Sequence, residues 1–354
     1  MVIDGAATLL EREREFEAFG RALTDARLGR GQIVLVEAAG GLGKTSLLKA
    51  ASNAAAEAGF RCLRARASEL ERDFGYGCVR QLLEPAVATL AVSERDRLFE
   101  GAAALSGPLF APTGVELSSR SADLSFSMLH GLYWLLNNLA DGGPVALSVD
   151  DLHWSDSESL RFLNYVTPRL DGLRVVVVAS TRSGGWPTDL ARLAASPETT
   201  VLRPAPLSMD ATAMLCERRL GARVEPDFAA ACCEVTGGNP FFLEALLREA
   251  VEKGLSARSG EAARVRRIAP AAVTQAVLLR LSGASATAGA LVRAVAVLGD
   301  GASLAEAAVM AELTDDGVAA AADQLVALDI LRPAERLEFA HPIMLEAVRA
   351  TPLA

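Results

Sequence analysis

A glycine-rich loop that ends in a lysine and a threonine is the segment of the chain with the clearest chemistry. The loop, Ala38-Ala-Gly-Gly-Leu-Gly-Lys44-Thr45, directly follows the apolar run Gln32–Val36. Glycines allow backbone N–H groups to approach a phosphate closely, and a helix that begins at the loop adds partial positive charge. The pattern predicts a phosphate-binding P-loop in which Lys44 reaches the β- and γ-phosphates and Thr45 offers its hydroxyl to Mg²⁺.

The loop departs at one position from the usual G-x-x-x-x-G-K-[ST] pattern, because Ala38 occupies the place of the first glycine. If that position needs a positive φ, alanine costs about 1 kcal/mol, which weakens affinity without abolishing it. The alternative is a glycine-rich loop that contains Lys-Thr by coincidence, which leaves the order of strand, loop and helix unexplained. The predicted nucleotide contacts of the loop are Gly40, Gly41, Gly43, Lys44, Thr45 and Ser46.

Two adjacent carboxylates follow a second apolar run. Val145–Val149 predicts a buried strand that delivers Asp150 and Asp151 to the edge of a sheet, where a metal site needs them. We expect Asp150 to hold Mg²⁺ through water, and Asp151 to act as the base or to orient the attacking water. Aspartate is one methylene shorter than the glutamate of fast ATPases, so slow hydrolysis is expected. The segment also suits the start of a helix, with Ser155 as its N-cap.

A single arginine follows another apolar run. Arg182 comes soon after Arg174–Ala179, so we expect it one strand away from the phosphate loop, where it can sense the γ-phosphate. An arginine at the end of a strand is also common as a surface residue. His153 has two interpretations as well, since it either links Asp151 to neighbouring loops or simply packs.

Alternating strands and helices must position these groups. We expect strands at Gln32–Val36, Arg61–Ala65, Val145–Val149, Arg174–Ala179 and Thr199–Leu202. We expect helices around them at Leu9–Leu23, Gly77–Leu90, Glu94–Leu105 and Ser121–Leu139. This alternation predicts an α/β fold, a P-loop NTPase with a parallel sheet and helices on both faces, whose ligand binds beyond the carboxyl ends of the strands.

The strand pattern ends after Pro204 and Pro206. Helices are expected at Met209–Leu220, Pro226–Thr236, Pro240–Lys253 and from Ala271 onward, with Ser256–Arg267 as a polar, solvated linker. The sequence therefore predicts a nucleotide-binding domain at 1–205, an all-helical unit at 206–255 and a third, helical segment at 268–354.

Composition excludes several classes of protein. The 354 residues carry a net charge of −9, so no overall basic field attracts nucleic acid or anionic lipid. Five cysteines without a C-x-x-C pair and three histidines do not complete a zinc site, and we interpret the cysteines as reduced thiols of a cytoplasmic protein. The N-terminal segment does not resemble a signal peptide, and the uncharged run Leu124–Ala140 is shorter than the roughly 20 residues of a membrane span. We expect no membrane partner.

Taken together, the motifs resemble the signal-transduction ATPases called STAND NTPases, specifically the ATPase portion of the large ATP-binding LuxR-type transcriptional regulators of bacteria. The resemblance covers nearly the whole chain. Leu10-Glu-Arg12-Glu13-Arg-Glu15 is similar to the Gly-Arg-Glu-x-Glu opening of that family, with Glu11 in place of the glycine. The resemblance implies that Arg12 and Glu13 lie near the adenine.

Three further segments are similar to signatures of the same family. Asp150-Asp-Leu-His-Trp154 resembles its Walker B signature, and Thr181-Arg182 resembles its sensor arginine. The most specific match is Thr236-Gly-Gly-Asn-Pro-Phe-Phe-Leu243, which in the family begins a lid helix and implies that Pro240 approaches the nucleotide. The residue types agree with a helix start, since Asn239 suits an N-cap and Pro240 suits a first turn.

The last family-like segment lies near the C-terminal end. Phe339-Ala-His341-Pro342 resembles the winged-helix segment in which some members place a histidine against the phosphates of ADP, which implies that role for His341. The resemblance makes 206–255 a lid and 268–354 a winged-helix-like domain, complete or not. Members bind DNA through an output domain, and none is apparent in this chain.

The resemblance implies a nucleotide switch of a LuxR-type regulator, with ATP or ADP and Mg²⁺ as cofactors and slow hydrolysis of ATP. It also implies self-association in the ATP state and an unknown inducer or protein partner. The alternative is a productive AAA-like ATPase that acts on a protein or DNA partner, which needs a glutamate-like base and an arginine from a second copy. A small-molecule kinase is a third hypothesis, but no acceptor pocket can be identified.

Overall fold

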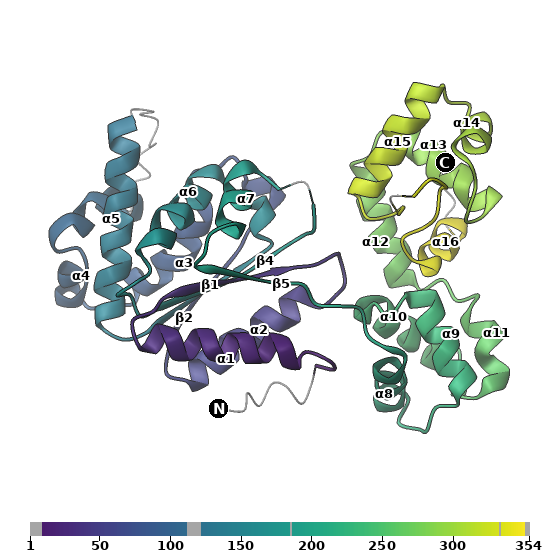
Figure 1. Cartoon of the computed structure of the whole chain (residues 1–354), viewed down its shortest axis with the longest axis horizontal. Coiled ribbons are helices and arrows are strands. Elements are labelled where there is room, and N and C mark those ends of the chain that lie inside the picture. Colours follow the sequence, from purple (N-terminus) through teal and green to yellow (C-terminus); the bar gives the residue numbers. More distant parts are fainter. Residues whose placement is uncertain (1–8, 112–121, 185, 333, 351–354) are drawn as a thin grey trace. The chain divides into compact units, whose positions relative to one another are not determined.

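A five-stranded parallel sheet organises the first part of the chain (Figure 1). The computed structural model describes residues 9–111, 122–184, 186–332 and 334–350. The strands are β1 Gln32–Glu37, β2 Arg61–Arg66, β3 Val145–Asp150, β4 Val175–Thr181 and β5 Thr199–Leu202. Their spatial order is β2-β3-β4-β1-β5, and each pair of neighbours is parallel. The five strands predicted from the sequence are confirmed, with boundaries that move by at most two residues.

Each face of the sheet packs against its own set of helices. Strand residues alternate between the two faces, so Val34 and Val36 of β1 pack with α1 (Glu13–Arg27) and α2 (Lys44–Glu57). Ile33 and Leu35 face the opposite core, which contains α3, α5, α6 and α7. The bounds of these four helices are Gly77–Ala88, Ala122–Asp141, Ser157–Val166 and Thr188–Ala194. Figure 1 shows the resulting layers, and the predicted α/β fold with helices on both faces is confirmed.

Two helix predictions in this part of the chain were wrong in their boundaries. The first helix begins at Glu13 rather than at Leu9, because Glu11 has a left-handed φ of 54° that a helix does not accept. The predicted helix Glu94–Leu105 is two elements, α4 at Val92–Leu98 and a 3-10 segment at Gly101–Phe110. The α-helix ends at Leu98 with Phe99 as its C-cap, and Gly101, with a left-handed φ of 66°, begins the 3-10 segment.

The chain divides into two compact units. The first contains residues 1–38 and 44–204, and the second contains residues 39–43 and 205–354. The tip of the loop after β1 therefore packs with the second unit, although the strand before it and the helix after it belong to the first. The assignment of a lid at 206–255 and a separate domain at 268–354 stays a prediction.

Helices build the second unit (Figure 1). They are α8 Met209–Leu220, α9 Pro226–Thr236, α10 Pro240–Glu252, α11 Ala262–Val265, α12 Ala271–Ser282, α13 Ala286–Leu298, α14 Leu304–Ala311, α15 Asp315–Ala327 and α16 Pro342–Arg349. The predicted linker Ser256–Arg267 was wrong, because it folds into a 3-10 turn and α11. Val265 is fully buried there, and Arg266 Nη2 lies 2.8 Å from Glu234 Oε2 of α9. The polar composition of this segment gave no indication that Val265 is buried against the rest of the unit.

Within the described residues, none of the helices combines the length and the apolar character that crossing a bilayer requires. The run Leu124–Ala140 lies inside α5, whose Leu132, Leu135 and Leu136 belong to the core between helices and sheet. Its uncharged composition therefore reflects burial in the protein, as expected for a helix that packs on a sheet.

Candidate functional site

The loop after β1 has the local geometry of a phosphate-binding loop. Gly41 and Gly43 have φ values of 86° and 87°, which residues with a Cβ rarely adopt. Lys44 is buried, and its Nζ donates a hydrogen bond of 2.7 Å to the carbonyl of Ala38 across the loop. Thr45 and Ser46 are exposed in the first turn of α2, where free backbone N–H groups are available. The predicted strand, loop and helix are confirmed.

Ala38 does not impose the expected penalty. It is not among the residues with positive φ, so the cost of about 1 kcal/mol for a left-handed alanine does not arise. Its backbone N–H donates to Thr181 O at 3.1 Å, which extends the pairing of β1 with β4 by one residue. Ala38 therefore continues the strand, and the turn begins after it.

Asp150 is the centre of a hydrogen-bonded cluster at the carboxyl end of the sheet. Thr45 Oγ1 donates to Asp150 Oδ2 at 2.8 Å, and Ser180 Oγ donates to Asp150 Oδ1 at 2.5 Å. Asp150 is 8% exposed and Ser180 is fully buried. The structure thus brings the threonine of the loop and the first carboxylate of the pair, the two residues that the sequence assigns to Mg²⁺, into direct contact.

Thr45 and Asp150 fit a magnesium ion. Both offer oxygen atoms, the ligands that Mg²⁺ prefers, and Mg²⁺ in such sites keeps several waters and uses one or two protein ligands. The threonine hydroxyl can donate its hydrogen to Asp150 and still offer a lone pair to a metal. A bound Mg²⁺ would neutralise charge on the β- and γ-phosphates. The described residues contain no cluster of three or more His, Cys, Asp or Glu side chains suited to a metal.

Ser180 was missed by the sequence analysis. Its hydroxyl accepts a hydrogen bond of 2.9 Å from the backbone N–H of Asp151 while it donates to Asp150. One buried hydroxyl therefore orients the Asp150 carboxylate and fixes the backbone of the next residue. The sequence does contain a sign of this role, because Ser180 is a polar residue directly after the apolar run Val175–Ala179, in a strand that is fully buried.

Asp151 has a strained backbone and a partly exposed carboxylate. Its φ is 56° and its ψ is 43°, a left-handed conformation that costs a non-glycine residue about 1 kcal/mol or more. Its Oδ2 lies 3.6 Å from Arg66 Nη2 at the end of β2. Burial and the neighbouring Asp150 raise the pKa of Asp151, while Lys44, Arg66 and Arg182 oppose the rise. A carboxylate with a raised pKa is better suited to accept a proton near neutral pH.

Arg182 is fixed through its backbone. Its N–H donates to His153 Nδ1 at 3.4 Å, and its carbonyl accepts a bond of 2.6 Å from Trp186 Nε1. Of the two interpretations of His153, the structure favours the linking one, because the imidazole joins the segment after β3 to the end of β4. The positive charge of Arg182 opposes the rise in the pKa of Asp151 and helps to lower the pKa of His153.

His153 is expected to stay neutral down to acidic pH. Burial lowers its pKa to about 4, with Arg182 and Lys44 acting in the same direction and Asp150 against it. The unfolded chain binds this proton near pH 6.5, so the stability that depends on neutral His153 is complete above pH 6.5 and declines as the pH falls toward 4. The chain has three histidines, and NMR titration, with the His153→Asn variant to assign its resonance, measures this pKa. A midpoint near 6.5 would contradict the expectation.

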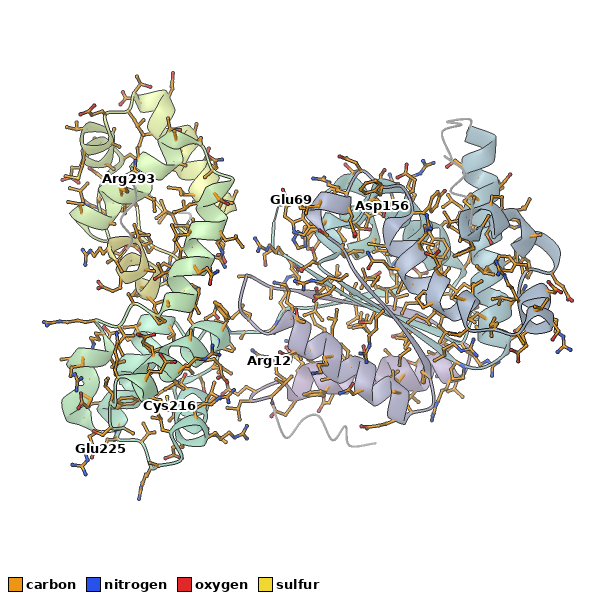
Figure 2. The ribbon with its side chains drawn as sticks, turned by 180° about the vertical axis from the view of Figure 1, so that it is seen from behind. Arg12, Glu69, Asp156, Cys216, Glu225 and Arg293 are labelled. Carbon is orange, nitrogen blue, oxygen red and sulfur yellow. The ribbon has the colours of Figure 1, made fainter. Side chains whose placement is uncertain are left out.

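The N-cap of helix α6 differs from the predicted one. The N-cap of α6 is Asp156 rather than Ser155, since Asp156 Oδ1 accepts from Ser159 N at 2.8 Å. The same carboxylate accepts from Tyr76 N at 2.7 Å and from Cys78 N at 3.3 Å, at the start of α3. Asp156, labelled in Figure 2, thus caps two helices of the first unit.

Arg12 and Glu13 lie at the start of α1 and differ in their exposure to solvent. Arg12 is 5% exposed and its Nη1 donates to Glu11 O at 2.8 Å, whereas Glu13 is exposed. Burial lowers the pKa of Arg12, and the nearby charges of Glu15, Glu11 and Glu13 oppose that change. The expected place of Arg12 and Glu13 near the adenine stays a prediction.

In the second unit, Asn239 connects a helix start to the loop residues 39–43. Its Oδ1 accepts from the backbone N–H groups of Phe241 and Phe242, which confirms the predicted N-cap of α10, with Pro240 in the first turn. Its Nδ2 donates to Gly40 O at 2.9 Å, and Phe241 N donates to Gly41 O at 3.2 Å. This bond to the loop was not predicted, because the sequence separates Asn239 from Gly40 by 199 positions.

His341 packs inside the second unit. Its ring lies edge-on to Phe242 with centroids 4.9 Å apart, and Nδ1 would lie 2.9 Å from a Cβ at Gly237. Nδ1 is buried without a hydrogen-bond partner. Burial is the main cause that lowers the pKa of His341, so the ring is neutral near pH 7. The segment 236–243 and His341 therefore meet, and the role of His341 at a phosphate stays a prediction.

This geometry defines the class of the first unit. A phosphate loop after β1 and a carboxylate at the end of β3 that contacts the threonine of that loop are the arrangement of a P-loop nucleoside triphosphatase. Residues 8–178 match the family described as AAA ATPase domain.

Three individual proteins are similar to this chain, and the first of them supports the fold. The Walker-type ATPase PABY2304 of Pyrococcus abyssi superposes with a TM-score of 0.62 over 97% of each chain, at 16% identity. The Orc1 protein of Aeropyrum pernix, solved in complex with DNA, is 16% identical with a TM-score of 0.49, over 97% of this chain and 93% of that chain. Protein R02095 of Rhizobium meliloti (strain 1021), which is uncharacterized, is 26% identical over 259 residues, or 67% of this chain and 24% of its own length. This chain thus matches about a quarter of that relative.

Proposed function

We propose that this chain is the ATP- and ADP-binding switch of a LuxR-type transcriptional regulator, with slow, Mg²⁺-dependent hydrolysis of ATP. The observation that carries the proposal is the contact of Thr45 with Asp150 beside the loop of Lys44. In this site Lys44 binds the β- and γ-phosphates, Thr45 and Asp150 hold Mg²⁺, and Asp151 orients water.

The bonds of Asn239 support a switch in addition to binding. A ligand can shift a conformational equilibrium only if it interacts differently with the two states. Gly40 and Gly41 accept hydrogen bonds from Asn239 and Phe241, so any nucleotide that moves the backbone of the loop also acts on the N-terminal end of α10. The match to a small part of the long R02095 chain supports an ATPase module that works inside a larger protein.

The productive AAA-like ATPase is the second candidate, and the match to the AAA ATPase domain is compatible with it. Such an enzyme requires rapid turnover on a protein or DNA partner. Asp151 argues against it despite its raised pKa, because its side chain is one methylene shorter than glutamate and lies 3.6 Å from Arg66 Nη2, which favours the charged, resting carboxylate.

The nucleotide content and the turnover rate separate these functions. We expect the purified protein, once denatured, to release nearly one equivalent of ADP, and the intact protein to hydrolyse Mg-ATP more slowly than about one turnover per minute, far below ordinary enzymes. Chromatography of the released nucleotide and a phosphate-release assay measure both. Sedimentation with ADP and with a non-hydrolysable ATP analogue is expected to show self-association only with the analogue. Steady turnover well above that rate would favour the productive ATPase, and absence of any nucleotide binding would contradict both.

A further inference from the structure

Helix α5 of the first unit carries a second apolar face besides the one that packs on the sheet. Its leucines belong to the core between helices and sheet, whereas Phe126 and Trp134 lie outside that core and stay 57% and 38% exposed. Phe126, His130 and Trp134 recur every four residues, which is the spacing of one face of a helix. A single exposed apolar side chain needs no explanation, but a contiguous apolar face marks an interaction site.

Rings from α5 and from the neighbouring helix α6 make this face continuous (Figure 1). Phe126 stacks on His130, with ring centroids 6.1 Å apart and 6° between the planes. Tyr165 of α6 lies edge-on to Phe126 at 5.9 Å and to Tyr133 at 6.3 Å, and Tyr133 lies edge-on to Trp134 at 5.6 Å. The two tyrosines also touch the core below. We call these five rings the aromatic surface.

His130 satisfies the polar atoms of the aromatic surface. Trp134 Nε1, which can only donate, donates to His130 Nε2 at 3.1 Å. Because Nε2 accepts, the imidazole is neutral and its proton is on Nδ1, which donates to the Tyr165 hydroxyl at 3.1 Å. The indole N–H and both imidazole nitrogens can therefore be covered by a partner without losing a hydrogen bond. The Tyr165 hydroxyl, which accepts here, keeps its own hydrogen to donate.

The charged residues on either side of Tyr165 are positive. Between Ser125 and Ala140, α5 has no charged residue. Arg161 and Arg169 come four residues before and four residues after Tyr165, and both are exposed. Arg169 Cζ lies 3.9 Å from the centroid of the Tyr165 ring, and its Nη1 donates to Tyr165 O at 2.7 Å. These contacts hold a planar guanidinium, the group best suited to bind a carboxylate, against the tyrosine whose hydroxyl can donate.

The composition of this face fits a protein segment better than a nucleic acid. Trp, Tyr and Arg are the residue types that carry most of the binding energy at protein interfaces. A single-stranded nucleic acid needs a positive groove along its backbone, whereas this chain has a net charge of −9. Phe126 and Trp134 are eight residues apart on α5, a rise of about 12 Å. Two turns of a partner helix, or about four extended residues, span that length.

We propose that the aromatic surface and Arg169 form a docking site for an acidic, apolar segment of a partner protein. Apolar side chains of this segment cover Phe126 and Trp134. A carboxylate of the segment accepts hydrogen bonds from Arg169 and from the Tyr165 hydroxyl. This inference goes beyond the proposed nucleotide switch and does not depend on it.

Selection of random 16-residue peptides displayed on phage, with the full chain as target, tests the proposal. We expect the selected peptides to combine large apolar residues with Asp or Glu and to contain few Lys or Arg. Fluorescence anisotropy of a labelled selected peptide then gives a dissociation constant for each variant. We expect Phe126→Ala and Trp134→Ala each to weaken binding about tenfold or more, as at interface hot spots. Arg169→Gln should weaken it about tenfold.

A change in the peptide tests the carboxylate contact directly. Replacing Glu or Asp of the selected peptide by the corresponding amide should weaken binding to the unaltered protein. The same replacement should cost little more once Arg169→Gln has removed the guanidinium, since the two groups act as one pair. Tyr165→Phe removes the hydroxyl and keeps the ring, and should weaken binding by about threefold to tenfold.

Matched variants elsewhere in the first unit control for exposure and charge. Phe74→Ala removes a phenylalanine that is 66% exposed, and Arg192→Gln removes an exposed arginine of α7. Both should leave the dissociation constant within twofold. If Trp134→Ala does not fold, Phe126→Ala and Arg169→Gln decide, because both side chains are exposed.

Four results would overturn the proposal. The first is a selection that yields no peptide, or basic peptides only. The second is binding that stays within twofold in the Phe126, Trp134 and Arg169 variants. The third is binding of labelled (dT)20 that Phe126→Ala abolishes, which would make the occupant a nucleic acid. The fourth is self-association of the unaltered protein in sedimentation that the same variant abolishes, which would make the occupant a second copy.

Discussion

Replacement of Lys44 by alanine is expected to lower the affinity for Mg-ATP and Mg-ADP by 100-fold or more, the effect of losing a charge-assisted contact worth about 3 kcal/mol. The ammonium of Lys44 is held inside the loop by its hydrogen bond to the carbonyl of Ala38. Calorimetric titration with each nucleotide measures the loss.

Thermal unfolding gives an independent measurement of the same loss. A ligand at 100 times its dissociation constant stabilises the folded state by about 2.7 kcal/mol, which for a unit of this size raises Tm by roughly 5–10 °C. We expect this shift in the unaltered protein and its absence in Lys44→Ala. Lys49→Ala is the matched control, because Lys49 lies one turn further along α2 and is exposed. Binding retained within threefold in Lys44→Ala would contradict the assignment of the phosphate loop.

The parts of the site that the sequence predicted are those that short segments encode. A strand, a glycine turn and a helix start are adjacent in the chain, so the loop from Ala38 to Thr45 could be assigned from residue types alone. Asp150 was assigned in the same way, because parallel strands bring their carboxyl ends to one edge. Its direct hydrogen bond with Thr45 was not predicted, although both residues had been assigned to the same Mg²⁺ site.

The residues that were missed depend on which elements are neighbours. Ser180 meets Asp150 because β3 pairs with β4, and the sequence does not state that order. Asn239 meets Gly40 through packing of the second unit, across 199 positions of the chain. Hydrophobic periodicity reports which face of an element is buried, and it does not report the partner that covers it.

Local chemistry also misled where two residues suited one role. Ser155 and Asp156 are both good N-caps, and Ser155 was the predicted one. The structure selects Asp156 because a carboxylate has two oxygens and can serve α6 and α3 together. Tyr76, at the start of α3, is 80 positions earlier in the chain than Asp156. The residues around Asp156 therefore do not indicate that its carboxylate also accepts hydrogen bonds from α3.

Replacement of Asp156 by alanine is expected to destabilise the first unit by about 3–5 kcal/mol, because three backbone N–H groups lose their acceptor at once. These groups belong to Ser159, Tyr76 and Cys78, and Asp156 itself is 2% exposed, so water cannot easily replace the carboxylate. Urea unfolding followed by the fluorescence of the tryptophans, all three of which are in the first unit, measures the change.

Two variants show which property of Asp156 matters. Asp156→Asn keeps Oδ1 as an acceptor for Ser159 and Tyr76 but places an amide donor toward Cys78 N, so we expect an intermediate loss of about 1–2 kcal/mol. Glu158→Gln removes another carboxylate charge in the first turn of α6 without removing a cap, and should cost less than about 1 kcal/mol. Equal losses in Asp156→Ala and Glu158→Gln would mean that charge at the helix start, rather than the shared cap, stabilises this corner of the site. A large loss confined to Asp156→Ala would instead connect the position of α3 and α6 to the carboxyl end of β3, where Asp150 holds Thr45.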